Sequence, residues 1–275
     1  MTFAEFLVRA LAAGIHDLFN TGILRAILSG GVSEVGKAVA IGGGFVLCII
    51  ASYLLGSVNF ALIISKCFFR DDVREHGSGN AGTTNVLRTY GKKAAIWTFV
   101  GDALKGVVAI LIAAIWFGAP DTEPNYLYLV TAVYLAAFFC VLGHVFPIFS
   151  HFRGGKGFAT MVGIILVLNP AIFLILFIIY VPLILCSHYI SLSSVVMALF
   201  WPLILSVVDR TITGYGIHVL FAVCIGVLIT WAHRGNLKRI FDGNERKFYP
   251  FRKKTPAVSA TPAEESAEEG GGSEE

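Results

Sequence analysis

The chain has 275 residues, of which 56% are hydrophobic and only 14% are charged, and its mean hydropathy is +0.76. Soluble domains contain about 45–50% apolar and about 25% charged residues, so this composition excludes a soluble domain and indicates a protein that crosses the membrane several times. The formal net charge of +3 is too small to favour nucleic acid as a partner.

The N-terminal segment 1–30 places Phe, Leu and Ile at helical spacing, interrupted by Glu5, Arg9 and Asp17. This pattern predicts an amphipathic helix on the membrane surface, within an N-terminal extension of residues 1–43. A loosely held terminal helix with no role in function is the alternative interpretation.

Five stretches are long and apolar enough for membrane helices, which need about 20 residues: 44–67, 94–118, 126–148, 189–208 and 216–233. A sixth apolar stretch, 157–187, is interrupted by Asn169-Pro170. Proline removes a backbone donor and disfavours helix at the residue before it, so this stretch is either one kinked helix or two short ones.

The distribution of basic residues decides between these two interpretations. Loops 68–93 and 149–156 and the segment after 233 are rich in Lys and Arg, whereas loops 119–125 and 209–215 are nearly free of them. Basic loops stay in the cytoplasm, and the crossings must alternate, so 157–187 has to supply two. We therefore expect an all-α membrane protein with seven transmembrane helices, two of them short, with the N-terminus outside and the C-terminus cytoplasmic.

The C-terminal segment 251–275 is acidic and rich in Pro, Gly and Ser. It should be a disordered tail that follows a membrane domain of residues 44–250. The five cysteines lie in or beside apolar runs without a metal or disulfide spacing, so we interpret them as small buried apolar residues. We expect no metal and no cofactor.

Three polar clusters fall on the predicted cytoplasmic face: residues 76–88, 143–160 and 233–247. The first two are rich in glycine, and all three carry hydroxyl, amide or basic side chains. Glycine lets backbone N–H groups converge on an anion, and these side chains add donors, so the pattern is typical of a phosphate site. Ordinary basic loops would explain the charges, but not two glycine-rich segments.

Two of these segments resemble nucleotide-binding motifs. Residues 77–82 match G-x-G-x-x-G, but no strand precedes them, which disfavours a dinucleotide site. Residues 154–157 resemble part of a P-loop, although Gly157 replaces the magnesium-binding hydroxyl, which disfavours a triphosphatase. A lysine and backbone N–H groups at the start of a helix still form an anion site.

Several polar residues lie inside or at the ends of predicted spans. Asp102 and Lys105 are three residues apart on one helix face and form either a structural salt bridge or a functional pair. Ser191 and Ser194 open the sixth span as caps, packing residues or substrate ligands. His144 and His233 end two spans beside the glycine-rich loops, so interface and functional roles both stay open for them.

The motifs, taken together, are Gly77-Ser-Gly-Asn80-x-Gly82-x-Thr84-Asn85-x-x-Arg88, Gly143-His144-x-x-Pro147…Gly154-Gly-Lys156-Gly157-x-Ala159-Thr160 and His233-Arg-x-Asn236-x-x-Arg239. In order and spacing they resemble the bacterial acyl-phosphate:glycerol-3-phosphate acyltransferase family over roughly residues 45–248. The third motif has Leu237 and Ile240 where the family pattern has Ile and Leu.

This resemblance implies an integral enzyme of phospholipid synthesis in the bacterial cytoplasmic (inner) membrane, with its active site facing the cytoplasm. The enzyme would transfer a fatty acyl group from acyl phosphate to the 1-hydroxyl of sn-glycerol 3-phosphate, giving 1-acylglycerol 3-phosphate (lysophosphatidic acid) and phosphate. It would act as a monomer, upstream of the second glycerolipid acyltransferase, with membrane lipid around it.

The residues suit that chemistry, because an acyl phosphate is already activated and the sequence has no Ser or Cys beside a His–Asp pair. Catalysis would come from orientation and charge stabilisation, with the hydroxyl proton passing to a substrate phosphate oxygen or to His233. The expected catalytic residues are Ser78, Arg88, Lys156, His233 and Asn236. The expected substrate-binding residues are Gly79, Asn80, Gly82, Thr84, Asn85, His144, Gly154, Gly155, Gly157 and Ser194.

Two other classes of protein remain as rivals. A transporter of organic phosphates would also use broken helices such as 157–187, but it needs polar residues on both membrane faces, and the predicted outer loops are nearly bare. A structural scaffold leaves the glycine-rich loops without a purpose.

Overall fold

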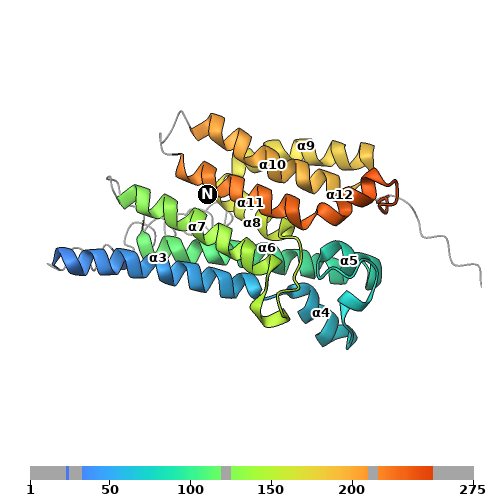
Figure 1. The fold of residues 1–275 in the computed structure, drawn as a ribbon, viewed down its shortest axis with the longest axis horizontal. Helices are drawn as coiled ribbons and strands as arrows, with labels where there is room; N and C mark the ends of the chain where they lie inside the picture. The colour runs from blue at the N-terminus through green and yellow to red at the C-terminus, as the bar shows by residue number, and fades with distance from the viewer. Residues whose placement is uncertain (1–22, 25–32, 119–124, 210–215, 250–275) are drawn as a thin grey trace, which may run out of the picture.

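The computed structural model describes residues 23–24, 33–118, 125–209 and 216–249, and every regular element within these ranges is helical. The amphipathic helix expected within 1–30 and the acidic tail 251–275 fall, except for residues 23–24, outside the described residues. The described helices form an elongated bundle whose shortest helices, α4, α5 and α12, gather at one end (Figure 1).

The described helices, in chain order, are α3 (Glu34–Ser57), α4 (Phe60–Phe69), α5 (Thr83–Thr89), α6 (Lys92–Phe117), α7 (Asn125–Val145), α8 (Phe158–Leu168), α9 (Pro170–Ser187), α10 (Ile190–Asp209), α11 (Ile217–Ala232) and α12 (Arg234–Phe241). Two short 3-10 turns, η1 (Val73–Glu75) and η2 (Ile148–Ser150), lie in the connections.

The first predicted span, 44–67, has different bounds in the structure. Its helix α3 begins at Glu34, because the Ser33 side chain accepts the Gly36 N–H at 3.2 Å and caps the first turn. The helix ends at Ser57, and Asn59 then caps α4 by accepting the Leu62 N–H at 3.0 Å. Two polar caps that hydropathy does not register therefore set these boundaries.

The predicted break inside 157–187 is confirmed, since α8 ends at Leu168 and α9 begins at Pro170. The proline occupies the first turn of α9, where its missing N–H leaves no intrahelical bond unmade. Within α8 there are 11 residues, which at 1.5 Å per residue extend about 16 Å, roughly half of a bilayer core.

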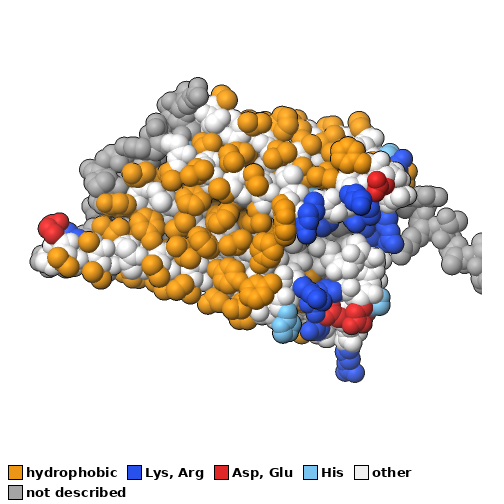
Figure 2. All heavy atoms as spheres, viewed as in Figure 1, with side chains coloured by type: hydrophobic (Ala, Val, Ile, Leu, Met, Phe, Trp, Pro, Cys, Tyr) orange, Lys and Arg blue, Asp and Glu red, His pale blue; other side chains and the backbone are white. Residues whose placement is uncertain are grey.

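Five described segments are long and apolar enough to cross a membrane: Glu34–Phe69, Lys92–Phe117, Leu127–Ser150, Pro170–Ser187 and Ile190–Val208. A sixth candidate arises only if α11 and α12, bent by 55°, count as one span, and α8 is a shorter apolar helix. Hydrophobic side chains cover the long side of the bundle, whereas charged side chains collect at the end carrying α4, α5 and α12 (Figure 2). The fold is thus an all-helical membrane bundle with one charged end.

Glycines allow the helices of the bundle to approach each other closely. A Cβ atom added at Gly56 would lie 2.1 Å from the carbonyl oxygen of Cys140, and one added at Gly143 would lie 2.3 Å from that of Tyr53. Gly163 on α8 likewise meets the backbone of α6. Small residues at crossings are the usual way for membrane helices to gain packing, and here they draw α3, α6, α7 and α8 together below the charged end.

Candidate active site

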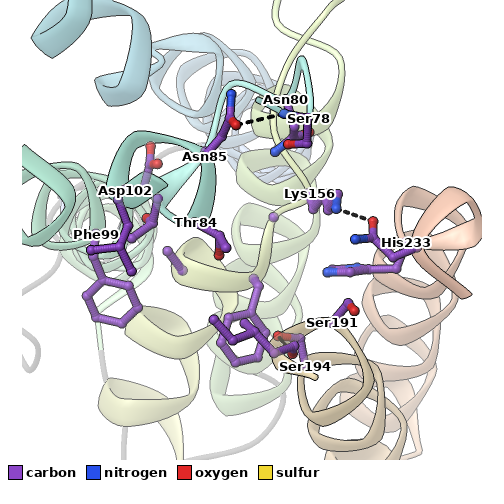
Figure 3. A pocket seen from close by; sticks show the side chains of 18 of the residues that line it. Ser78, Asn80, Thr84, Asn85, Phe99, Asp102, Lys156, Ser191, Ser194 and His233 are labelled. Atoms are coloured by element: carbon purple, nitrogen blue, oxygen red, sulfur yellow. Dashed lines mark hydrogen bonds between the residues drawn. The ribbon is translucent and has the colours of Figure 1, made fainter. Parts of the chain in front are cut away.

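A cavity of about 220 Å³ opens near the charged end, with walls from the loop preceding α5, from α5 to α12 and from the segment after α12. Most of the predicted site residues line it: Ser78, Asn80, Gly82, Thr84, Asn85, Arg88, His144, Lys156, Gly157, Ser194, His233 and Asn236. Lys156 lies between Ser78 and His233, with Ser191 and Ser194 on the opposite wall (Figure 3). Three segments that are distant in sequence thus converge on one site.

Asn85 shapes the first glycine-rich loop from inside. Its side chain is buried, its oxygen accepts the Ser78 N–H at 2.9 Å, and its amide nitrogen donates to the carbonyl oxygens of Val73 at 2.8 Å and His76 at 2.9 Å. Gly77 has φ +62° and packs against this amide. Because its polar atoms are already bonded within the protein, Asn85 positions Ser78 instead of offering itself to a ligand.

The sequence predicted that the glycines of the two loops would offer backbone N–H groups to phosphate, but several of them serve close packing instead. The N–H groups of Gly79, Gly82 and Gly155 already donate to protein carbonyl oxygens at 3.0–3.1 Å, so they are not free to cradle a phosphate. Added Cβ atoms at Gly154 and Gly155 would each lie 2.1 Å from an atom of His144. Gly154 and Gly155 therefore lie behind the cavity wall, and Gly79 lines an adjoining shallow hollow.

The start of α8, where the sequence predicted an anion site, opens directly onto the cavity. Gly157 has φ +80° and precedes the first helical residue, and Phe158 and Ala159 also line the cavity. The first intrahelical bond runs from the Met161 N–H to Gly157 O, which leaves the N–H groups of the first turn unpaired within the helix. Such a helix start attracts anions.

Lys156 belongs to a polar network that crosses the cavity. Its ammonium group donates to the side-chain oxygen of Asn236, whose nitrogen donates to Glu245 at 2.6 Å. Glu245 also accepts from Ser191 at 3.1 Å and from Arg239 at 2.8 Å. Burial is the largest cause that lowers the pKa of Lys156, to about 8, so the side chain is mostly charged at neutral pH and loses its charge as the pH rises above 8.

His233 is fixed in one orientation at the end of α11. Its side chain is buried, and Nδ1 lies 2.8 Å from the carbonyl oxygen of Ile229, so Nδ1 must carry the proton and Nε2 the lone pair. Burial first, and then the charge of Lys156, lower the pKa of His233 to about 4. The imidazole is therefore neutral at physiological pH.

One side of the cavity is apolar. Leu87, Phe99, Phe158, Tyr180 and Ile190 line it, and the Phe158 and Tyr180 rings stack with centroids 5.5 Å apart. These residues come from α5, α6, α8, α9 and α10. A ligand with a polar head and an apolar chain fits this division.

Sequence reasoning missed Glu245 as a site residue. It stands in a charged C-terminal segment, and its place depends on a long-range contact, the Phe248 N–H donating to the His188 carbonyl oxygen at 2.7 Å. That contact folds the segment over the start of α10. Burial alone would raise the pKa of Glu245, but hydrogen bonds from Asn236, Arg239 and Ser191 outweigh it and lower that pKa, so the carboxylate stays charged.

Asn59 was also missed as a residue that supports the site. Its side-chain nitrogen donates to the Ala81 carbonyl oxygen at 3.2 Å while its oxygen caps α4. The signal available in the sequence was a polar residue inside the predicted span 44–67. Asn59 thus ties the first span to the loop that carries Ser78.

Comparisons with known proteins agree with this geometry. The family described as Glycerol-3-phosphate acyltransferase matches residues 34–243. A "Glycerol-3-phosphate acyltransferase 3" of Bacillus anthracis is 39% identical over 201 residues, which are 73% of this chain and 93% of the relative. A "Glycerol-3-phosphate acyltransferase" of Paraburkholderia xenovorans is 37% identical over 212 residues, 77% of this chain and 94% of the relative.

A solved structure is similar as well. The crystal structure of PlsY (YgiH), an integral membrane glycerol 3-phosphate acyltransferase in its glycerol 3-phosphate form, superposes with a TM-score of 0.66 at 35% identity. The match covers 74% of this chain and 96% of the other. A lysophosphatidic acid form of PlsY matches with a TM-score of 0.64. The chain belongs to the glycerol-3-phosphate acyltransferase family.

Proposed function

We propose that this protein transfers a fatty acyl group from acyl phosphate to the 1-hydroxyl of sn-glycerol 3-phosphate, giving lysophosphatidic acid and inorganic phosphate. The observation that carries the proposal is the division of one cavity into a phosphate-binding end and an apolar wall. The phosphate-binding end has positive potential and hydrogen-bond donors, which come from Arg88, Lys156 and the start of α8. The aromatic wall accommodates the beginning of an acyl chain.

The reaction needs no covalent intermediate on the protein. The 1-hydroxyl oxygen attacks the acyl carbonyl carbon, and the carbonyl oxygen takes up negative charge. The bond from that carbon to the phosphate oxygen then breaks as the carbonyl re-forms. Neither Ser191 nor Ser194 is paired with a histidine base: Ser191 donates to the Glu245 carboxylate, which also accepts from Asn236 and Arg239, and Ser194 donates to its own helix at 2.8 Å. Orientation and charge stabilisation carry the catalysis.

The hydroxyl proton goes to a phosphate oxygen of the substrate. A phosphate group has a second pKa of about 6, whereas burial and the charge of Lys156 lower the pKa of His233 to about 4, so the phosphate is the stronger base. His233 instead offers its Nε2 lone pair to hold the hydroxyl in line. Ser78, Arg88, Lys156 and Asn236 bind the two phosphates, and Thr84 lines the same cavity.

We further propose the arrangement of the protein in the cytoplasmic membrane of a bacterium. The basic loops argue for a cytoplasmic active site and C-terminus, with α8 and α9 entering and returning as two short crossings of a seven-crossing path. Single cysteines placed at Ser150 and at Asp121 in a variant whose five own cysteines are replaced by alanine, labelled from one side in intact cells, test this. Labelling of both from the same side would refute the proposed topology.

We also propose that one chain suffices for activity, since a single chain supplies all the cavity walls. Its product, an acylated glycerol phosphate with one free hydroxyl, suits a second acyltransferase that acts next. Residues 44–250 form the catalytic domain in this proposal, with 1–43 and 251–275 as additions to it.

The acyl donor is tested with purified protein in detergent. We expect palmitoyl phosphate and glycerol 3-phosphate to yield lysophosphatidic acid, and palmitoyl-CoA to yield none. Turnover with palmitoyl-CoA alone would refute the donor assignment. Accumulation of labelled glycerol 3-phosphate in proteoliposomes without acylation would favour transport over catalysis.

A further inference from the structure

A cluster of buried charge lies beneath the cavity and has no part in the mechanism above. Asp102 and Lys105 on α6 and His144 on α7 are only 1%, 2% and 3% exposed. Asp102 and His144 also line the cavity. Ionic groups within a membrane protein are costly, so a cluster that reaches an active site calls for a specific role.

Lys105 is held by the end of α3 and by a carboxylate of its own helix. Its ammonium group donates to the carbonyl oxygens of Gly56 at 2.9 Å and Val58 at 2.7 Å, at the end of α3. The Asp102 carboxylate, 3.0 Å away, compensates its charge. The α3 carbonyls have no other helical donor, and a cation is favourable at a helix C-terminus, so the position of Lys105 is fixed.

The same ammonium group determines which ring nitrogen of His144 is protonated. Lys105 Nζ lies 2.8 Å from His144 Nδ1, and an ammonium group can only donate. Nδ1 must therefore accept, and the single proton of the neutral ring resides on Nε2. The competing arrangement, Nδ1–H donating to Asp102, would have to span 3.5 Å, which is too long for a strong hydrogen bond.

The Nε2–H group of His144 faces the active-site loop. A Cβ atom added at Gly155 would lie 2.1 Å from Nε2, so only glycine lets the loop carrying Lys156 rest on the imidazole. The loop is also tied down by the Gly155 N–H, which donates to the His144 carbonyl oxygen at 3.1 Å. Among the described residues, no protein group is hydrogen-bonded to Nε2, although the ring borders the cavity.

We propose that Lys105, neutralised by Asp102, is a positioning residue that locks His144 in the Nε2–H tautomer, and that His144 donates this N–H to an oxygen of the bound acyl phosphate. The proposal rests on the proposed function. A fixed neutral donor stabilises negative charge that develops on the substrate, and because its partner nitrogen is occupied it cannot act as the base. The N–H group of His144 would therefore stabilise the charge on the acyl phosphate, while the proton of the attacking hydroxyl passes to a phosphate oxygen.

The tautomer can be measured in the unmodified protein without any substrate. Protein labelled with 15N-histidine in detergent is examined by NMR at pH 7.5, and the His144 signals are assigned by their loss in His144→Gln. We expect an unprotonated Nδ1 and a protonated Nε2. The Nδ1–H tautomer or an imidazolium ring would overturn the proposal. Neither result depends on the identity of the acyl donor, so this test is separate from the test of function.

A kinetic cycle tests the link between the two residues. Glutamine at 144 keeps an N–H donor near the Nε2 position without a ring tautomer, so we expect His144→Gln to retain more activity than His144→Leu. Lys105→Met should lower kcat about 10- to 100-fold with the glycerol 3-phosphate KM within about threefold. In the His144→Gln background the further loss should shrink to about threefold.

Equal losses of kcat from Lys105→Met in both backgrounds would show that Lys105 only holds the helices together, and would overturn the proposal. The matched control is Lys93→Met, which removes an exposed lysine at the start of the same helix and should leave kcat unchanged within about twofold.

Discussion

The depressed pKa of Lys156 predicts how activity depends on pH. If the ammonium form binds phosphate and its pKa is about 8, then about 90% of the protein is charged at pH 7 and about 10% at pH 9. We therefore expect kcat/KM to fall about tenfold between these pH values, because the charged form is lost as pH rises. Initial rates of phosphate release at subsaturating glycerol 3-phosphate, in detergent, measure this decline.

The variant Lys156→Arg provides the control, since a guanidinium group stays charged throughout this range. Its absolute kcat/KM should be lower, because its shape and hydrogen bond to Asn236 differ, but the decline above pH 8 should disappear. The imidazole of His233, which also lines the cavity, has a pKa lowered to about 4 and does not change its charge in this range. A wild-type profile that is flat to pH 9.5, or an unchanged decline in Lys156→Arg, would refute this reasoning.

Three further variants probe separate parts of the site. Arg88→Lys removes a planar, two-pronged phosphate contact, so kcat/KM should fall about 10- to 100-fold, and near-wild-type turnover would contradict the assignment. Gly155→Ala places a Cβ atom 2.1 Å from His144 Nε2 and should reduce kcat/KM at least about a hundredfold, whereas Gly42→Ala, with open space around it, should have no effect. Glu245→Ala leaves Asn236 and two other donors without an acceptor and should destabilise the protein by about 1–3 kcal/mol; a melting temperature in detergent matching wild type would exclude this role.

Much of the fold follows from hydropathy and charge. The lengths of the apolar stretches located α6, α7, α10 and α11 to within a few residues. The alternation of basic and non-basic loops required 157–187 to be divided, and the structure has this division at Pro170. The start of α3 was missed, because residues 34–43 include Glu34 and Lys37 and look less like a span. Their ion pair at 2.7 Å and the Ser33 cap depend on local geometry that hydropathy ignores.

The sequence predicted which side chains lie together at the site better than it predicted the role of the backbone. Motif spacing brought Ser78, Lys156 and Asn236 into one proposed site, and they do line one cavity. The glycines were expected to present free N–H groups to phosphate, but the sequence cannot distinguish a backbone cradle from close packing. Gly155 serves close packing, because its N–H donates to the His144 carbonyl oxygen and a Cβ atom on it would collide with the His144 ring.

The central claim is direct transfer from acyl phosphate to glycerol 3-phosphate within this cavity. The most direct measurement follows inorganic phosphate and lysophosphatidic acid together in one reaction of purified protein with palmitoyl phosphate. We expect the two products in a 1:1 ratio, no phosphate burst when glycerol 3-phosphate is omitted, and loss of both products in Lys156→Ala. Phosphate release equal to the protein concentration in the absence of glycerol 3-phosphate, or lysophosphatidic acid formed without phosphate, would contradict the account.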